Sequence, residues 1–130
     1  MIDDVEFLKH ILEAGRRVHE YTQSGRTAFE TDNLIQDAVI RNLEVIGEAV
    51  KNLSDAFRLE HASIPWKRIA GLRDTLIHRY FFVQLDLVWD VVEMHLPPLM
   101  TQVEAIRAKL DATPQNTFQD NPDSTDAKPT

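Results

Sequence analysis

An arginine, a histidine and a tyrosine stand at a short, defined spacing in the middle of the chain. They are Arg73, His78 and Tyr80, in the pattern R-x-x-x-x-H-x-Y. The arginine supplies a permanent cation, the histidine can exchange a proton near neutral pH, and the tyrosine supplies a phenol. One such set has too few groups to close around a substrate, whereas two sets facing each other across a symmetric dimer could. The structural alternative is an arginine paired with a carboxylate, a histidine that ends a helix and a tyrosine packed by its ring.

The three residues lie on a predicted helix that begins at about Pro65 and ends near Tyr80. Pro65 suits the first helical position, and apolar residues recur after it at helical spacing. At 3.6 residues per turn, Arg73 and Tyr80 come to nearly the same face, while His78 is offset by about a third of a circle. Gly71, inside this helix, costs about 1 kcal/mol relative to alanine. Close approach of another helix, for example the same helix of a second subunit, would explain its presence.

Three further helices are expected from hydrophobic periodicity and capping residues, and no segment has the alternation typical of a strand. Their expected ranges are Asp3 to Tyr21, Thr31 or Asp32 to Leu53, and Gln84 to Lys109. Ser24 to Arg26 is expected to be a turn, Ser54 to Ser63 is expected to be a polar connection, and Pro97 and Pro98 should kink or split the last helix. The sequence therefore predicts an all-α, up-and-down four-helix bundle over residues 1–110, followed by a disordered polar, acidic tail over residues 111–130.

The second helix carries two glutamates one turn apart, Glu44 and Glu48. The favoured interpretation places both on a solvated face. The alternative places one of these carboxylates beside Arg73 as an orienting partner. His10, on the first helix, is also expected on a solvated face.

The composition is that of a globular protein with an acidic balance. The formal net charge is −7, and the chain contains no cysteine, which excludes disulfides, thiolate metal sites and a cysteine nucleophile. The stretch from Pro65 to Tyr80 holds four basic residues and one acidic residue, a local charge of +3, so a nucleic-acid contact would concentrate there. No apolar run approaches the roughly 18 residues of a membrane span and the N-terminus lacks a basic signal-peptide start, so a cytoplasmic location is expected.

Three stretches of the chain occur in the order found in one known family. They are Asp37 to Ala49, the run from Ile64-Pro65-Trp66 to Leu76-Ile77-His78-Arg79-Tyr80-Phe81, and Val88-Trp89-Asp90-Val91-Val92 with Leu96-Pro97. Together they resemble the HepT-like branch of the HEPN (higher eukaryotes and prokaryotes nucleotide-binding) superfamily. The resemblance covers about residues 1 to 110.

The resemblance implies a ribonuclease that uses neither a metal nor another cofactor and whose active site forms at a homodimer interface. By this analogy, His78 would transfer a proton and Arg73 would stabilise the charge that develops on the phosphorus. Asp74 would orient Arg73 or the opposite histidine. Asp74 and Gln84 both depart from the family pattern, which often has asparagine and aspartate at these positions. Further RNA contacts are expected from Lys67, Arg68 and Arg79.

The resemblance also implies a partner protein and a mode of control. HepT-like proteins are toxins paired with a minimal nucleotidyltransferase antitoxin (MntA-like), which transfers AMP to the motif tyrosine, here Tyr80. The partners expected are thus a second copy, the antitoxin and RNA, with no DNA and no membrane. Two alternatives stay open: a non-catalytic HEPN nucleotide-binding module, or a dimeric helical scaffold for a nucleotidyltransferase.

Overall fold

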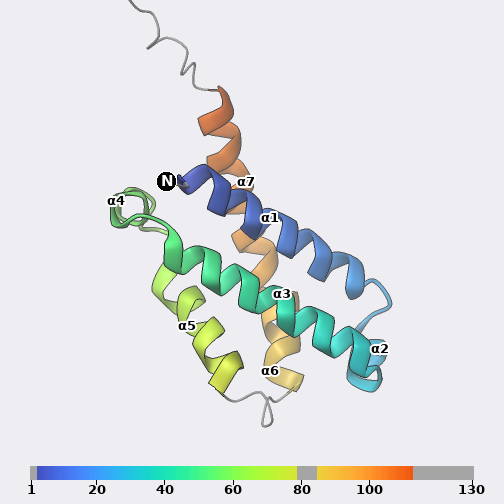
Figure 1. The fold of residues 1–130 in the computed structure, drawn as a ribbon. Coiled ribbons are helices and arrows are strands. Elements are labelled where there is room, and N and C mark those ends of the chain that lie inside the picture. Colours follow the sequence, from blue (N-terminus) through green and yellow to red (C-terminus); the bar gives the residue numbers. More distant parts are fainter. Residues whose placement is uncertain (1–2, 79–84, 113–130) are drawn as a thin grey trace, which may run out of the picture.

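The computed structural model describes residues 3–78 and 85–112, and every regular element in these ranges is helical. The elements are α1 (Asp4–Tyr21), α2 (Arg26–Thr31), α3 (Asn33–Asn52), α4 (Asp55–Glu60), α5 (Trp66–His78), α6 (Leu85–Asp90), the π-helical turn η2 (Val91–His95) and α7 (Leu96–Ala112). Four long helical segments, α1, α3, α5 and the continuous α6–η2–α7, form an all-α bundle (Figure 1). The predicted fold class is confirmed.

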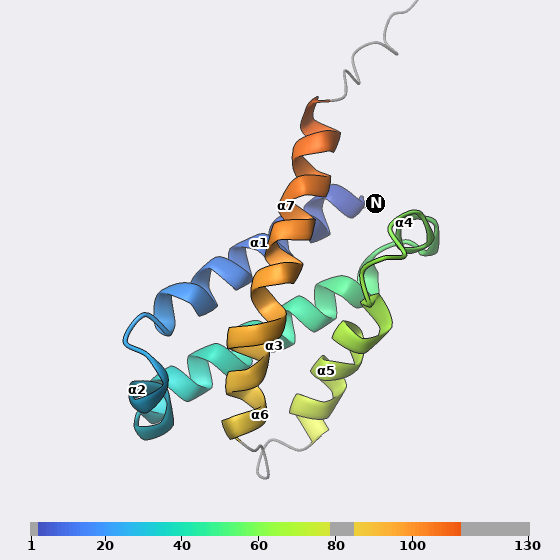
Figure 2. The same ribbon diagram turned by 180° about the vertical axis from the view of Figure 1, so that it is seen from behind.

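The long segments alternate in direction along the chain. α1 and α3 run antiparallel to each other, α5 turns back along α3, and α6–η2–α7 crosses behind α1 and α3 in the view of Figure 1. Figure 2 shows the molecule from behind, where α6–η2–α7 lies in front and crosses α1 and α3. α3 packs against α1 on one side and against α5 on the other, so it is the helix on which α5 is positioned.

The core consists of apolar side chains from all the long helices and from both short ones. Leu8, Ile11, Val18, Phe29, Leu43, Ile46, Val39, Val50 and Val103 are its largest fully buried members. Burial of this apolar surface is the main force that holds the helices together. In the part of the chain that the structure describes, no helix is long and apolar enough to cross a membrane.

The starts of the first two long helices agree with the capping residues in the sequence. Asp3 caps α1 through its side chain, which accepts a hydrogen bond from the backbone N–H of Glu6, at 3.3 Å. Asp32 caps α3 in the same way and accepts from the backbone N–H of Leu34, at 2.9 Å. A carboxylate at this position satisfies a free N–H group and complements the helix dipole.

Two short helices occupy segments that the sequence predicted only as connections. α2 has no side-chain cap, and it is held by Phe29, which is fully buried and stacks on Trp89 with ring centroids 5.4 Å apart. α4 begins at Ser54, whose hydroxyl accepts from the N–H of Phe57 at 3.1 Å, and Phe57 is buried beside Trp66. Helices of six residues are too short to show a periodic pattern, so a single buried aromatic residue decides each of them.

The last helical segment is split, as its two prolines predicted. The break lies just before Pro97, where η2 widens the helix and the N–H of Leu96 bonds to the carbonyl of Val91, five residues back. Pro97 and Pro98 have no N–H group, and their rings would collide with carbonyls of the preceding turn in a regular helix. The wider turn removes this conflict. α7 then continues to Ala112, two residues beyond the predicted end of the domain, and residues 113–130 lie outside the described residues.

Candidate active site

α5 carries the part of the sequence pattern that the structure describes, and a buried tryptophan anchors its start. The indole Nε1 of Trp66 donates to the carbonyl of His61 at 3.0 Å, and the N–H of Ile69 bonds to the carbonyl of Pro65 at 3.1 Å. Pro65 is therefore the residue just before the helix rather than its first helical residue. α5 ends at His78; Arg79 and Tyr80 lie outside the described residues.

Arg73 lies at a close approach of α5 to α3. A Cβ atom built on Gly47 of α3 would collide with the Cβ of Arg73 and would lie 3.1 Å from its Cα and N atoms. Only glycine at position 47 allows the two backbones to come this near, because it has no side chain. Among the described residues no close crossing occurs at Gly71, since none lies within 4 Å of a Cβ at that position.

Two carboxylates hold the guanidinium of Arg73. Nε lies 3.1 Å from Oε1 of Glu48, and Nη1 donates to Oδ1 of Asp74 at 3.0 Å. Lys51, one turn beyond Glu48 on α3, bonds to the same Asp74 oxygen at 3.3 Å. The favoured sequence interpretation, that Glu48 belongs only to a solvated face, was wrong: its side chain is 54% exposed but reaches Arg73 across the helix crossing.

The basic neighbours of Asp74 change its titration. The hydrogen bond from Arg73, and then that from Lys51, holds the pKa of the Asp74 carboxyl below its usual value. A carboxyl whose pKa is lower in the folded state stabilises the fold above its unfolded pKa and loses that contribution as the pH falls through the folded value.

An Asp74→Asn substitution is therefore expected to lower the melting temperature at neutral pH, by a small amount because the site is exposed. The difference from the wild type should shrink as the pH falls below about 4, where aspartates become protonated. Thermal unfolding followed by circular dichroism from pH 3 to 7 measures this difference. Asp90→Asn, on an exposed residue at the end of α6, is the control. A pH-independent difference for Asp74→Asn would contradict the assignment.

A cavity of about 230 Å³ with several charged residues in its lining opens beside Arg73, between α1, α3 and α5. Its lining includes His10 from α1 and Arg41, Glu44 and Glu48 from α3. Sequence reasoning expected His10 only on a solvated face and attached no role to Arg41. Arg41 and Arg73 are 32 residues apart in the sequence, and this spacing does not indicate that they share a cavity. The packing of α3 on α5 places both in the lining.

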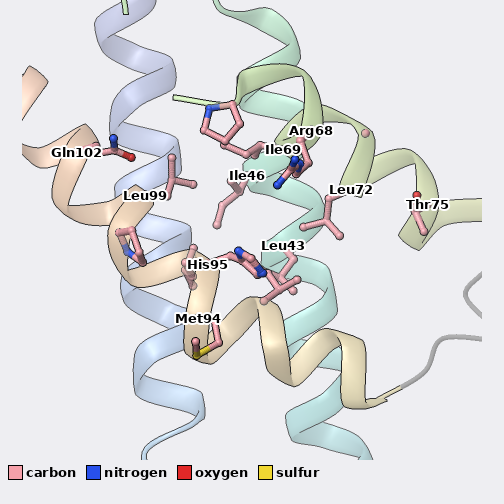
Figure 3. A pocket seen from close by; sticks show the side chains of 15 residues that line it. Leu43, Ile46, Arg68, Ile69, Leu72, Thr75, Met94, His95, Leu99 and Gln102 are labelled. Atoms are coloured by element: carbon pink, nitrogen blue, oxygen red, sulfur yellow. The ribbon is translucent and has the colours of Figure 1, made fainter. Parts of the chain in front are cut away.

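A second, larger cavity of about 560 Å³ lies on the other side of α5, between α5 and the η2–α7 segment. Figure 3 shows Leu43 and Ile46 of α3 at its floor, with Leu72 of α5 on one side and Leu99 of α7 on another. Most of its lining is apolar, and we call it the apolar groove. Arg68 lies at this groove and not at the Arg73 cavity, whereas Lys67 is exposed and lines neither. Neither Lys67 nor Arg68 therefore lines the Arg73 cavity, and Arg79 lies outside the described residues.

Position 78 and Arg73 lie on different faces of α5. Five residues of α-helix correspond to a rotation of about 140°. Position 78 therefore shares an angular sector with Lys67 and Gly71, about 140° around α5 from Arg73. Within residues 3–78 and 85–112, no three His, Asp or Glu side chains gather as a metal site requires.

Comparison with known proteins identifies the family of this chain. The family described as "Ribonuclease HepT-like" matches residues 11–106, which is most of the chain. The chain belongs to the ribonuclease HepT-like family. The match includes all of α3 and α5, and with them Gly47, Glu48, Arg73 and Asp74.

Individual HepT-like relatives support the assignment over nearly the same range. A Methanocaldococcus jannaschii protein named a gamma-glutamylcyclotransferase and, provisionally, an RNase is 43% identical over 113 residues, and the match spans 86% of this chain but only 51% of that relative. A protein of Caldanaerobacter subterraneus subsp. tengcongensis, provisionally named an RNase, is 41% identical over 79% of this chain and 93% of its own length. A Thermococcus cleftensis protein provisionally named ribonuclease HepT is 40% identical over 78% of this chain and 94% of its own. No solved structure matches the chain.

Proposed function

We propose that this protein is an endoribonuclease that cleaves RNA without a metal ion and acts as the toxin of a toxin–antitoxin pair. The observation that carries the proposal is the HepT-like match across the helix that presents Arg73 and His78. The relatives named above as ribonucleases add support, because two of them match over nearly their whole length. Arg73 is chemically suited to the role, since a guanidinium can bind two oxygens of a phosphate at once.

The proposed reaction uses the 2′-hydroxyl of RNA as the nucleophile. His78 accepts the proton of this hydroxyl as its oxygen attacks the adjacent phosphorus, and a new bond forms between the 2′-oxygen and phosphorus. The bond from phosphorus to the 5′-oxygen of the next nucleotide breaks, and that oxygen takes up a proton. Arg73 stabilises the negative charge on the phosphorane oxygens between the two events. The products are a 2′,3′-cyclic phosphate and a free 5′-hydroxyl.

A second copy of the chain is part of this proposal. Arg73 extends toward α3, whereas position 78 lies about 140° away around α5, so a single α5 separates the two residues by direction. The sector of position 78 offers a docking surface: Gly71 is open, the apolar groove lies beside it, and Met94 on the rim is 62% exposed. Such an apolar surface is typical of a protein–protein contact. The proposal is that a homodimer forms through this surface and that the shared active site uses Arg73 and His78 of both copies.

Control by a nucleotidyltransferase antitoxin completes the proposal. Transfer of AMP to Tyr80 would add a charged phosphodiester and an adenosine two residues beyond His78. Both the bulk and the negative charge would oppose RNA binding at Arg73.

Co-production with the antitoxin is expected to yield toxin carrying AMP on Tyr80. Mass spectrometry of the intact protein and of its peptides should show one AMP group, which disappears in a Tyr80→Phe variant. Tyr21, the other tyrosine of the chain, should stay unmodified and is the internal control. Silenced toxin with an unmodified Tyr80 would eliminate this mode of control.

The direct test of ribonuclease activity uses purified, unmodified protein and defined RNAs in the presence of EDTA. Cleavage that leaves 2′,3′-cyclic phosphate ends, at a rate unchanged by the chelator, is the expected result. Loss of cleavage in EDTA would contradict the metal-free scheme. Absence of cleavage under both conditions would contradict ribonuclease activity altogether.

One observation also favours the non-catalytic alternative, in which the chain is a helical scaffold. The pairing of Arg73 with Glu48 and Asp74 is the ion-pair arrangement that a purely structural role requires. In that case RNA cleavage should be absent, and substitutions in the motif should affect only stability.

A further inference from the structure

The closest carboxylate contacts of Arg73 involve two of the three nitrogens of its guanidinium. Glu48 lies at Nε and Asp74 at Nη1, so the two carboxylates hold opposite ends of the planar group. Neither carboxylate makes its closest contact with Nη2. This nitrogen belongs to both of the edges through which arginine binds a phosphate. A guanidinium held at both ends presents this nitrogen in a fixed direction.

We propose that Glu48 is a positioning residue that acts through Arg73. The inference rests on the proposed ribonuclease function and extends it from α5 to α3. Glu48 fixes the Arg73 guanidinium before RNA arrives, so that Arg73 does not have to reorient as charge develops on the phosphate. Interactions prepared in this way lower the barrier of the chemical step more than they strengthen substrate binding.

The local sequence of α3 matches this task. Gly47 lets α5 approach closely enough for the Glu48 carboxylate to reach Nε of Arg73. Lys51, one turn later, bonds to Asp74 and so holds the second carboxylate at its place beside Nη1. Glu48 of α3 therefore lies beside Arg73 of α5, and Lys51 of α3 lies beside Asp74 of α5. Each of these charges has a neighbour of opposite sign on the other helix. The four charges balance, and the two basic residues hold the pKa of the Asp74 carboxyl below its usual value.

A Glu48→Gln substitution tests the proposal, with Glu44→Gln as the matched control. Glu44 lies one turn earlier on the same helix and lines the same cavity, but it pairs with no residue in the described part of the chain. With EDTA-resistant cleavage of a defined RNA as the assay, Glu48→Gln should lower kcat about tenfold and change KM less than twofold. Glu44→Gln should change neither. Circular dichroism and melting temperature establish that both variants are folded.

A double-mutant cycle separates positioning from a structural or electrostatic effect. In an Arg73→Ala background, Glu48→Gln should cause no further loss of kcat, because the group through which Glu48 acts is gone. An equal tenfold loss in both backgrounds would overturn the proposal. So would an unchanged kcat, or a lowered KM in Glu48→Gln, since the latter would mean that Glu48 competes with RNA for Arg73. Each of these outcomes requires wild-type cleavage, whereas a wild type without cleavage refutes the proposed function itself.

Discussion

Replacement of His78 by alanine is expected to reduce the rate of RNA cleavage by about 100- to 10,000-fold, the usual contribution of a general acid or base. Replacement of Arg73 by alanine should reduce it by about 100- to 1,000-fold, because an electrostatic partner of the transition state is lost. Initial cleavage rates in EDTA measure both effects. If the chain is a toxin, both variants should also abolish growth inhibition in cells that lack the antitoxin.

Matched residues elsewhere in the chain serve as controls. Arg58 on α4 has the same side-chain exposure as Arg73, 29%, and is also paired with a carboxylate, that of Asp55 at 2.7 Å. His19 lies in the last turn of α1, as His78 lies at the end of α5. Arg58→Ala and His19→Ala should keep wild-type cleavage. If the motif variants behave like these controls, the chain is a scaffold or a binding module and not a nuclease.

Substitution of Gly47 by alanine is expected to destabilise the protein by about 2 kcal/mol or more. The added methyl group would collide with the Arg73 Cβ and press on the α5 backbone. Overpacking of this kind typically costs about 1–3 kcal/mol, and the neighbouring backbone cannot rotate away as a side chain can. This cost exceeds the gain of about 1 kcal/mol from replacing a helical glycine by alanine. Chemical denaturation gives the free energy of unfolding.

Gly15→Ala is the matched control for this prediction. Gly15 is also a glycine inside a long helix, but the nearest atoms to its added Cβ would be Sδ, Cε and Cγ of the flexible Met100 side chain. Methionine adapts readily to such changes, so we expect a change of less than about 1 kcal/mol. Equal destabilisation by the two substitutions would contradict the view that the α3–α5 crossing depends on Gly47.

The long helices could be predicted from the sequence, because their information is local. Apolar periodicity and a capping aspartate define α1 and α3 to within one residue or so of their observed bounds, and Pro97 with Pro98 indicates the break before α7. α2 and α4 could not be predicted in this way. Their helical state depends on Phe29 and Phe57 reaching buried sites that other segments create.

For the candidate site, too, the sequence determined the features that are local, and the tertiary structure determined the contacts between helices. By itself, the sequence determined an all-α chain of the HepT-like type and the order of Arg73, Asp74 and His78 along one helix, because both follow from local spacing. Only the tertiary structure decided which carboxylate meets Arg73. Glu44 and Glu48 have the same chemistry and differ by one turn, and the choice between them depends on where Gly47 lets α5 cross α3. The distance between two helices is set by the packing of the whole core, and no segment of the chain carries that information alone.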